Sequence, residues 1–285
     1  MSCPKWQVDG VARLRPLDEE VNLQLYRTQG GYHDLVHPTL EHASVADVLA
    51  YRHEAIHDYI FRTTKFGLVQ LVFKALAEQT NDDTLKRSSL LIGSMLYGSS
   101  IIAHEAAATY LSVKEVPTSL QAKMLDAYPD PYKNYYAKLA AICDPVFRAS
   151  RPQLTLGKVV CSLALGGSVL REAARWDGGP ELDLGDNVTP NEFLELMISS
   201  RAFTKEEIQE QFRFRAKDKG LDASILIDID DAEEWRRMPL RNFDDVEDVL
   251  YESCMAVAAA HDLGKFMRWA EDSDDAALLL SLIHI

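Results

Sequence analysis

The sequence predicts a mainly α-helical protein, and three observations lead to this fold class. Apolar residues recur at helical spacing through several long stretches, of which residues 84–113 are the clearest. Polar caps and prolines stand where these stretches begin and end. Beyond the first 40 residues, only residues 221–229 alternate between apolar and polar side chains, so we expect a single strand there.

Two long helices are expected in the first half of the chain. Residues 1–40 are interrupted by prolines and glycines, which indicates an irregular arm with a short strand or helix. A helix then runs over residues 44–77, with a weak point at residues 63–67 where two threonines and a glycine occur. After a polar turn at residues 80–83, the second long helix covers residues 84–113.

The rest of the chain is also expected to be helical. Residues 114–176 continue the helical pattern up to a Gly- and Pro-containing boundary at residues 176–187. Residues 189–201 open with Thr-Pro-Asn-Glu, a capping box with proline at the first helical position. Further helices are expected over residues 204–219 and 244–270.

The expected organisation is one larger and one smaller region. Residues 1–180 form a helical metal-binding domain, and residues 181–279 form a smaller, mostly helical C-terminal region. The last six residues, 280–285, are what the codons CTG TCT CTT ATA CAC ATC would encode, and these codons match a transposon end used in sequencing libraries. We therefore expect these six residues to be an adaptor artefact and the C-terminal region to be truncated.

The composition disfavours several classes of protein. The 285 residues are 47% hydrophobic and 26% charged, as in ordinary globular proteins. The net charge of −14 argues against a nucleic-acid or anionic-membrane surface. The four cysteines form no CxxC pair, so we expect reduced thiols. With no apparent signal peptide or membrane span, the expected location is cytoplasmic, while the oligomeric state stays open.

The most informative stretch is a His-Glu-x-x-His motif inside the first long helix. His53 and His57 lie four residues apart and share one helix face, so they can bind one ion, with Glu54 beside them. Neutral imidazoles bind Zn²⁺ well, and the ion makes water acidic enough to ionise near neutral pH. Glu54 is then the expected general base, a pattern typical of zinc metallopeptidases. The alternative is an amphipathic helix with two ordinary, partly buried histidines.

The second long helix is expected to supply a third ligand. A short turn joins the two helices, so they should be antiparallel, with Glu105 at about the same height as His57. We prefer Glu105 because a carboxylate balances the charge of the ion. The alanines at residues 106–108 also let the helices approach closely. The neighbouring His104 is the alternative, since three histidines also form catalytic zinc sites.

These residues together resemble the zincin metallopeptidases of the gluzincin type, in which a second helix supplies a glutamate that is often followed by small residues. The resemblance implies three zinc ligands, a general base and a peptide or protein substrate, with these residues in the site: His53, His57, Glu105 and Glu54. The chain is also similar to poorly characterised bacterial proteins whose related motif runs into Thr-Thr-x-aromatic-Gly-Leu, here residues 63–68. The likeness covers about residues 45–112.

Three other interpretations stay open. Glu54 and His57 also form a Glu-x-x-His pair, as in ferritin-like di-iron oxygenases, although that architecture needs a second such pair, which the sequence lacks. His-Asp-Leu-Gly-Lys at residues 261–265 resembles the core of HD-domain phosphohydrolases, which also need a histidine on an earlier helix. A catalytically inactive zincin-like protein or a helical binding module is the third.

Several further residues have two possible roles. Asp58 either orients one of the histidines or is a solvated surface charge. Three histidines before the motif are either extra ligands or, as the intervening Pro38 favours, loop residues: His33, His37 and His42. Four tyrosines line either a substrate cleft or a half-exposed helix face: Tyr128, Tyr132, Tyr135 and Tyr136.

Overall fold

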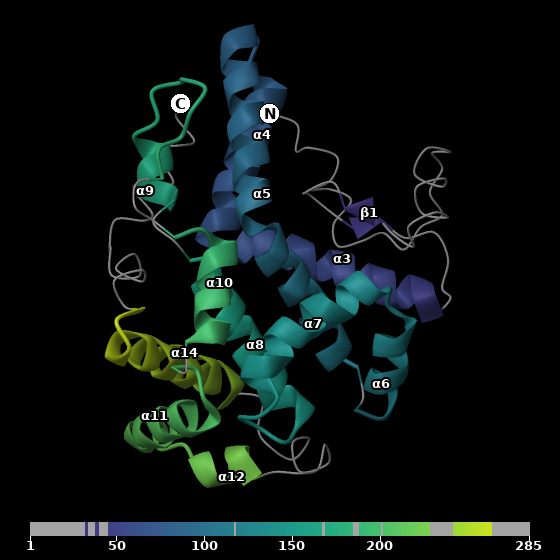
Figure 1. The fold of residues 1–285 in the computed structure, drawn as a ribbon, viewed down its shortest axis with the longest axis vertical. Helices are drawn as coiled ribbons and strands as arrows, with labels where there is room; N and C mark the ends of the chain where they lie inside the picture. The colour runs from purple at the N-terminus through teal and green to yellow at the C-terminus, as the bar shows by residue number, and fades with distance from the viewer. Residues whose placement is uncertain are drawn as a thin grey trace.

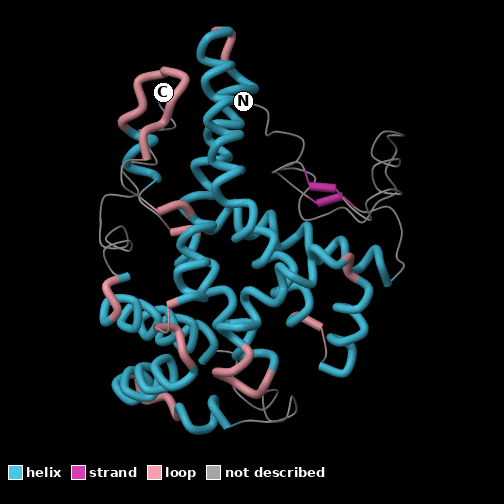
Figure 2. Tube along the Cα trace, viewed as in Figure 1, coloured by secondary structure: helices cyan, strands magenta, loops and turns pink. Residues whose placement is uncertain are grey.

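Helices make up nearly all of the chain that the structure describes (Figures 1 and 2). The computed structural model describes residues 32–33, 38–39, 45–116, 118–166, 169–184, 188–200, 202–228 and 242–263. Within these ranges the only strands are β1 (Tyr32–His33) and β2 (Pro38–Thr39), which pair antiparallel. The mainly α-helical fold class is therefore confirmed, as is a short strand in the N-terminal arm.

A corner divides the first long helix into α3 (Val45–Thr63) and α4 (Lys65–Gln79). The Thr64 hydroxyl caps α4 by accepting a hydrogen bond from the backbone N–H of Gly67. The chain passes very close to itself here, because a Cβ atom on Gly67 would lie 2.5 Å from Cα of Phe61. Only glycine fits this approach. The weak point predicted at residues 63–67 is confirmed as this corner.

The longest described helix, α5 (Asp83–Lys114), runs through the centre of the molecule. The Asp82 carboxylate caps it by accepting two backbone hydrogen bonds. Figure 1 shows α4 and α5 side by side as a hairpin, whereas α3 lies across α5. The antiparallel pair is therefore α4 with α5. The helix that carries the His-Glu-x-x-His motif crosses α5, because the corner at Thr64 turns it away from the hairpin.

Four shorter helices follow α5, and three of them pack against it. They are α6 (Thr118–Ala127), α7 (Asp130–Cys143), α8 (Ser150–Ala164) and α9 (Val169–Ala174), of which α9 packs against α4. As a result, α5 is buried on every side from Ala106 to Lys114. A helix that is apolar all round belongs in a core. The predicted helical continuation over residues 114–176 is confirmed.

The described residues of the C-terminal part add four helices to the same core. They are α10 (Pro190–Ser199), α11 (Lys205–Asp218), α12 (Ala223–Asp228) and α14 (Asn242–Ala260). Helix α10 packs on α5, α7 and α8, and it opens with the predicted capping box between Thr189 and Glu192. One buried apolar cluster extends from Ile56 to Leu263, so residues on both sides of position 180 share a core.

The predicted strand at residues 221–229 is wrong, because α12 occupies this stretch. The buried residues Ala223, Leu226 and Ile227 are spaced three and four apart and form one helix face. The Asp222 carboxylate accepts a backbone hydrogen bond in the first turn. This cap favours a helix more strongly than the short alternation of polar and apolar residues favours a strand.

The last predicted helix, over residues 244–270, ends earlier than expected. Helix α14 stops at Ala260, and Asp262 then adopts a φ of 59°, a left-handed conformation that terminates helices. Residues after 263 lie outside the described part of the chain.

No described helix combines the length and the apolar content that crossing a membrane requires. Three cysteines are buried free thiols, as predicted: Cys143, Cys161 and Cys254.

Candidate metal centre

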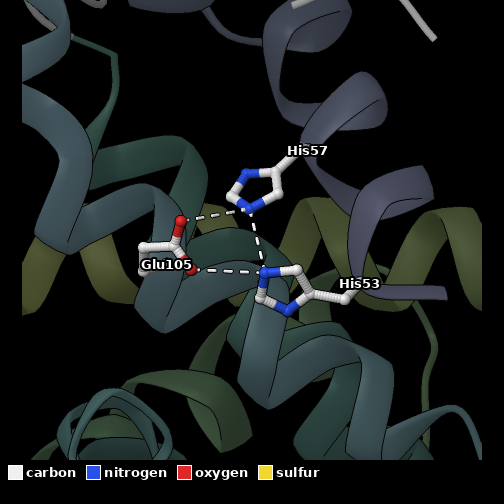
Figure 3. A group of neighbouring side chains, drawn as sticks. All are labelled: His53, His57 and Glu105. Carbon is white, nitrogen blue, oxygen red and sulfur yellow. Dashed lines mark hydrogen bonds and ion pairs between the residues drawn. The ribbon is translucent and has the colours of Figure 1, made fainter. Parts of the chain in front are cut away.

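Three side chains from two crossing helices point toward one another (Figure 3). Nε2 of His53 and Nε2 of His57, both on α3, lie 3.1 Å apart. Glu105 on α5 places Oε2 3.2 Å from Nε2 of His53 and Oε1 3.5 Å from Nε2 of His57. Within the described residues these three form the only group of histidine, cysteine or acidic side chains that could hold a metal ion.

The distances between the donor atoms fit a metal ion at their centre. A tetrahedral zinc ion with bonds of about 2.0 to 2.2 Å has ligand atoms about 3.3 to 3.6 Å apart. The two Nε2 atoms lie 3.1 Å apart, and Oε2 and Oε1 of Glu105 lie 3.2 and 3.5 Å from Nε2 of His53 and of His57, close to this range. Oε2 of Glu105 is also buried and accepts no well-directed hydrogen bond, which is costly unless another partner binds it. The donor set therefore suits a small divalent cation.

The charges in the group are strongly coupled. Burial raises the pKa of Glu105, but its contacts with His53 and His57 outweigh this effect and hold the pKa far below its usual range. Burial lowers the pKa of His53 more than Glu105 raises it. The pKa of His57 is raised, because its contacts with Glu105 and the charge of Glu54 outweigh its burial. Glu105 is thus ionised and His53 neutral, the forms in which these groups bind metals.

Glu54 follows His53 on α3 and is the most perturbed acid beside the triad. Burial raises its pKa from 4.5 to about 7, His57 opposes this shift, and the negative charge of Glu105 adds to it. A carboxyl group with a pKa near neutrality exchanges protons readily at the working pH of most enzymes. Glu54 is therefore suited to accept and release a proton next to the three donor atoms.

A chain of hydrogen bonds behind His53 fixes the orientation of its ring. Nδ1 of His53 lies 3.4 Å from the hydroxyl of Tyr128, which lies 2.9 Å from the hydroxyl of Ser112. Ser112 donates in turn to the backbone carbonyl of Thr109. Since that carbonyl only accepts, we assign every step in one direction, with Nδ1–H of His53 donating first. This tautomer leaves the lone pair on Nε2, which faces Glu105.

The sequence placed Tyr128 among four tyrosines with two possible roles, but it did not predict the contact of Tyr128 with His53. The ring of Tyr128 and that of Tyr132 approach His53, with ring centroids 5.9 and 5.3 Å away. These two tyrosines therefore contact the candidate metal centre, while the substrate cleft stays a prediction. Tyr136 instead lies against Tyr110, with ring centroids 5.3 Å apart. No local pattern could have separated them, since the contacts span more than 70 residues of chain.

His104 lies behind the triad. Its ring stacks near His57 with centroids 6.1 Å apart and contacts Phe61 at 4.6 Å. Burial lowers the pKa of His104 to about 3, so the ring is neutral. Both ring nitrogens are buried without a hydrogen-bond partner among the described residues. Of the two alternatives for the third ligand, the structure places Glu105, not His104, in the donor group.

Other predicted candidates lie away from the triad. Asp58 pairs with Arg62 at 2.8 Å on the exposed side of α3, in accord with a surface charge. His261 is exposed after the end of α14 and lies 3.7 Å from Glu207. The side chain of His33 and all of His37 and His42 lie outside the described part of the chain.

Comparison with known proteins adds no relative. No family model, no curated protein and no solved structure matches this chain.

Proposed function

We propose that this protein is a zinc-dependent hydrolase that cleaves peptide bonds. The observation that carries the proposal is the convergence of His53, His57 and Glu105. The two Nε2 atoms lie 3.1 Å apart, and the two Glu105 oxygens lie 3.2 and 3.5 Å from them, as ligands of one ion would. Glu54 beside them supplies the base that hydrolysis needs. The resemblance of residues 45–112 to gluzincins favours a peptide bond as the bond that is cleaved.

Each residue of the site has a separate role in the proposed hydrolysis. When bound, Zn²⁺ polarises a carbonyl group and lowers the pKa of a water molecule. His53 and His57 hold the ion through Nε2, and the Glu105 carboxylate balances part of its charge. Glu54, with a pKa of about 7, accepts a proton from the attacking water and passes it to the leaving amine. Tyr128 keeps the His53 ring in place.

Two alternatives are less well supported. A di-iron oxygenase needs a second Glu-x-x-His pair, and the described residues contain a single candidate metal group. The described part of the HD-like sequence lies at an exposed helix end, where His261 is paired with Glu207. A protein that binds zinc but hydrolyses nothing shares the same geometry, so activity has to be measured.

Metal content is the first test. Mass spectrometry of the purified full chain should find one zinc per chain, and His57→Ala and Glu105→Ala should each remove it. His261→Ala is the matched control, because this exposed histidine lies outside the donor group. A folded wild-type protein without metal would refute the proposal, and two irons per chain would favour the oxygenase.

Cleavage of a peptide library is the second test. Glu54→Gln should keep the zinc and lower the turnover number at least 100-fold, because the base is lost while the ligands remain. Glu78→Gln, at an exposed position of α4, should change neither. Zinc binding without any cleavage by the wild type would leave a zincin-like binding module instead.

A further inference from the structure

The N-terminal half of α5 has an unusual surface. Residues 88–103 contain no charged side chain, in a chain that is 26% charged. One side of this run is nevertheless exposed, since Leu90 is 57% exposed, Leu91 58%, Met95 40% and Tyr97 43%. An exposed apolar helix face of this length usually marks a binding surface.

One line of this surface leads to the candidate metal centre. Leu90, Ser94, Tyr97 and Ile101 follow one another at spacings of four, three and four residues, so they form a stripe along one face of α5. We call these four residues the uncharged stripe. The next position on the same face is Glu105, a member of the donor group. The stripe therefore ends at the site.

Three tyrosines surround the end of the stripe. Tyr97 belongs to α5, while Tyr132 and Tyr135 belong to α7, with their two rings 6.1 Å apart. Tyr132 also contacts His53. We call these three residues the tyrosine rim. All three are partly or fully exposed, so their rings are available to a ligand.

Two acidic side chains of the candidate metal centre, Glu105 and Glu54, lie near the rim. The pKa of Tyr97 is raised, and that of Tyr132 is raised to about 12, first by burial and then by the charges of Glu105 and Glu54. An acidic peptide would have to remove its carboxylates from water against the uncharged stripe, so it should bind there more weakly than an apolar one.

We propose that the uncharged stripe and the tyrosine rim bind an apolar, uncharged segment within a polypeptide chain and lead it to the metal centre. This inference rests on the proposed function and narrows its substrate class. Apolar side chains of the segment pack on Leu90 and Ile101 of the stripe, and the tyrosine rings contact the residues next to the cleaved bond.

The test places a charge on the stripe and measures binding without turnover. In the Glu54→Gln background, fluorescence anisotropy is measured with a fluorescein-labelled twelve-residue peptide of Leu, Phe, Ala and Ser, and with a second peptide that carries Glu at alternate positions. The variants are Leu90→Glu and Ser94→Glu. Phe214→Glu on α11, where the side chain is 65% exposed, is the matched control.

We expect Leu90→Glu and Ser94→Glu each to weaken binding of the apolar peptide at least tenfold, with zinc content and helical content unchanged. Phe214→Glu should bind like its parent, and the acidic peptide should bind at least tenfold more weakly. Equal binding by the stripe variants, or binding of neither peptide, would overturn the inference. A wild-type dimer that Leu90→Glu converts to a monomer in sedimentation would also overturn it, because a second copy would then cover the stripe.

The same proteins separate this inference from the proposed function. Apolar-peptide binding that depends on the stripe, in a chain without zinc or cleavage, rejects the hydrolase and keeps the binding surface. Zinc binding and cleavage that are insensitive to Ser94→Glu reject the binding surface and keep the hydrolase.

Discussion

The hydroxyl of Tyr128 lies 3.4 Å from Nδ1 of His53, although 75 residues separate them in the chain. Residues that orient a metal-binding histidine affect the metal almost as much as the ligands do, since they fix the tautomer and the direction of the lone pair. This contact ties the turn between α6 and α7 to the candidate metal centre.

Tyr128→Phe should therefore weaken zinc binding about tenfold while leaving the fold intact. A competitive titration against a zinc chelator measures the effect. Tyr251→Phe is the control, because this half-buried tyrosine lies on α14, away from the triad. Equal zinc affinity in all three proteins would show that Tyr128 does not position His53.

Gly67→Ala should destabilise the protein by about 2 kcal/mol, because the added Cβ would lie 2.5 Å from Cα of Phe61 and overpacking costs about 1 to 3 kcal/mol. Gly93→Ala is the opposite case. A Cβ there meets nothing within 4 Å, and alanine favours a helix interior, so we expect a gain of about 0.5 to 1 kcal/mol. Urea denaturation of both variants measures the difference, and equal stabilities would contradict the tight corner.

Lys114→Met tests a buried polar network on α5. Nζ of Lys114 lies 2.9 Å from Oδ1 of Asp144 and donates to Gln153, while the Tyr110 hydroxyl donates to the same Asp144 oxygen. Removing the cation leaves these acceptors short of a partner, so we expect a loss of about 3 kcal/mol by urea denaturation.

The control for that network is an exposed pair. Lys133→Met breaks the contact of Lys133 with Asp130, whose side chain is 92% exposed. The expected loss is below about 0.5 kcal/mol. Similar losses in the two variants would mean that the buried network adds no stability of its own.

Glu54 should make the metal-free protein less stable as the pH rises. Its pKa of about 7 in the folded chain exceeds the ordinary 4.5, so the folded state holds the proton more tightly. This contribution is fully present below about pH 4.5 and is lost as the pH rises through 7. Glu54→Gln mimics the protonated acid and should stabilise the chelator-treated protein by about 2 kcal/mol at pH 8, but not at pH 4.5. A gain of equal size at both pH values would argue against the raised pKa.

The local part of the site was predictable because helix geometry alone sets it. His53 and His57 share a face wherever residues four apart are helical, and a short turn after α4 brings α5 back past α3. Glu105 could be predicted as the third ligand because α5 returns past α3 and because small residues follow Glu105. The crossing of α3 and α5 did not follow, because it depends on the close approach at Gly67, a three-dimensional contact.

Contacts between distant segments explain what the sequence could not predict. Tyr128 reaches His53 only because α6 and α7 fold back onto α5. Helix α12 was mistaken for a strand because six residues are too few to separate the two periodicities. The end of α14 depended on the backbone of Asp262, which no residue pattern marked.

Three consecutive alanines, Ala106–Ala108, follow Glu105 directly and are fully buried. Their small side chains set the distance between α5 and the neighbouring helices. An alanine side chain ends at Cβ, so the neighbouring helices settle close to the α5 backbone, and a carboxylate on a short side chain reaches imidazoles on another helix. Each added methylene would push a neighbouring helix outward by a fraction of an ångström, a large part of the tolerance of a metal–ligand bond. Larger residues at these alanine positions would therefore abolish metal binding even with every ligand in place, because they change the distance between the helices that carry the ligands.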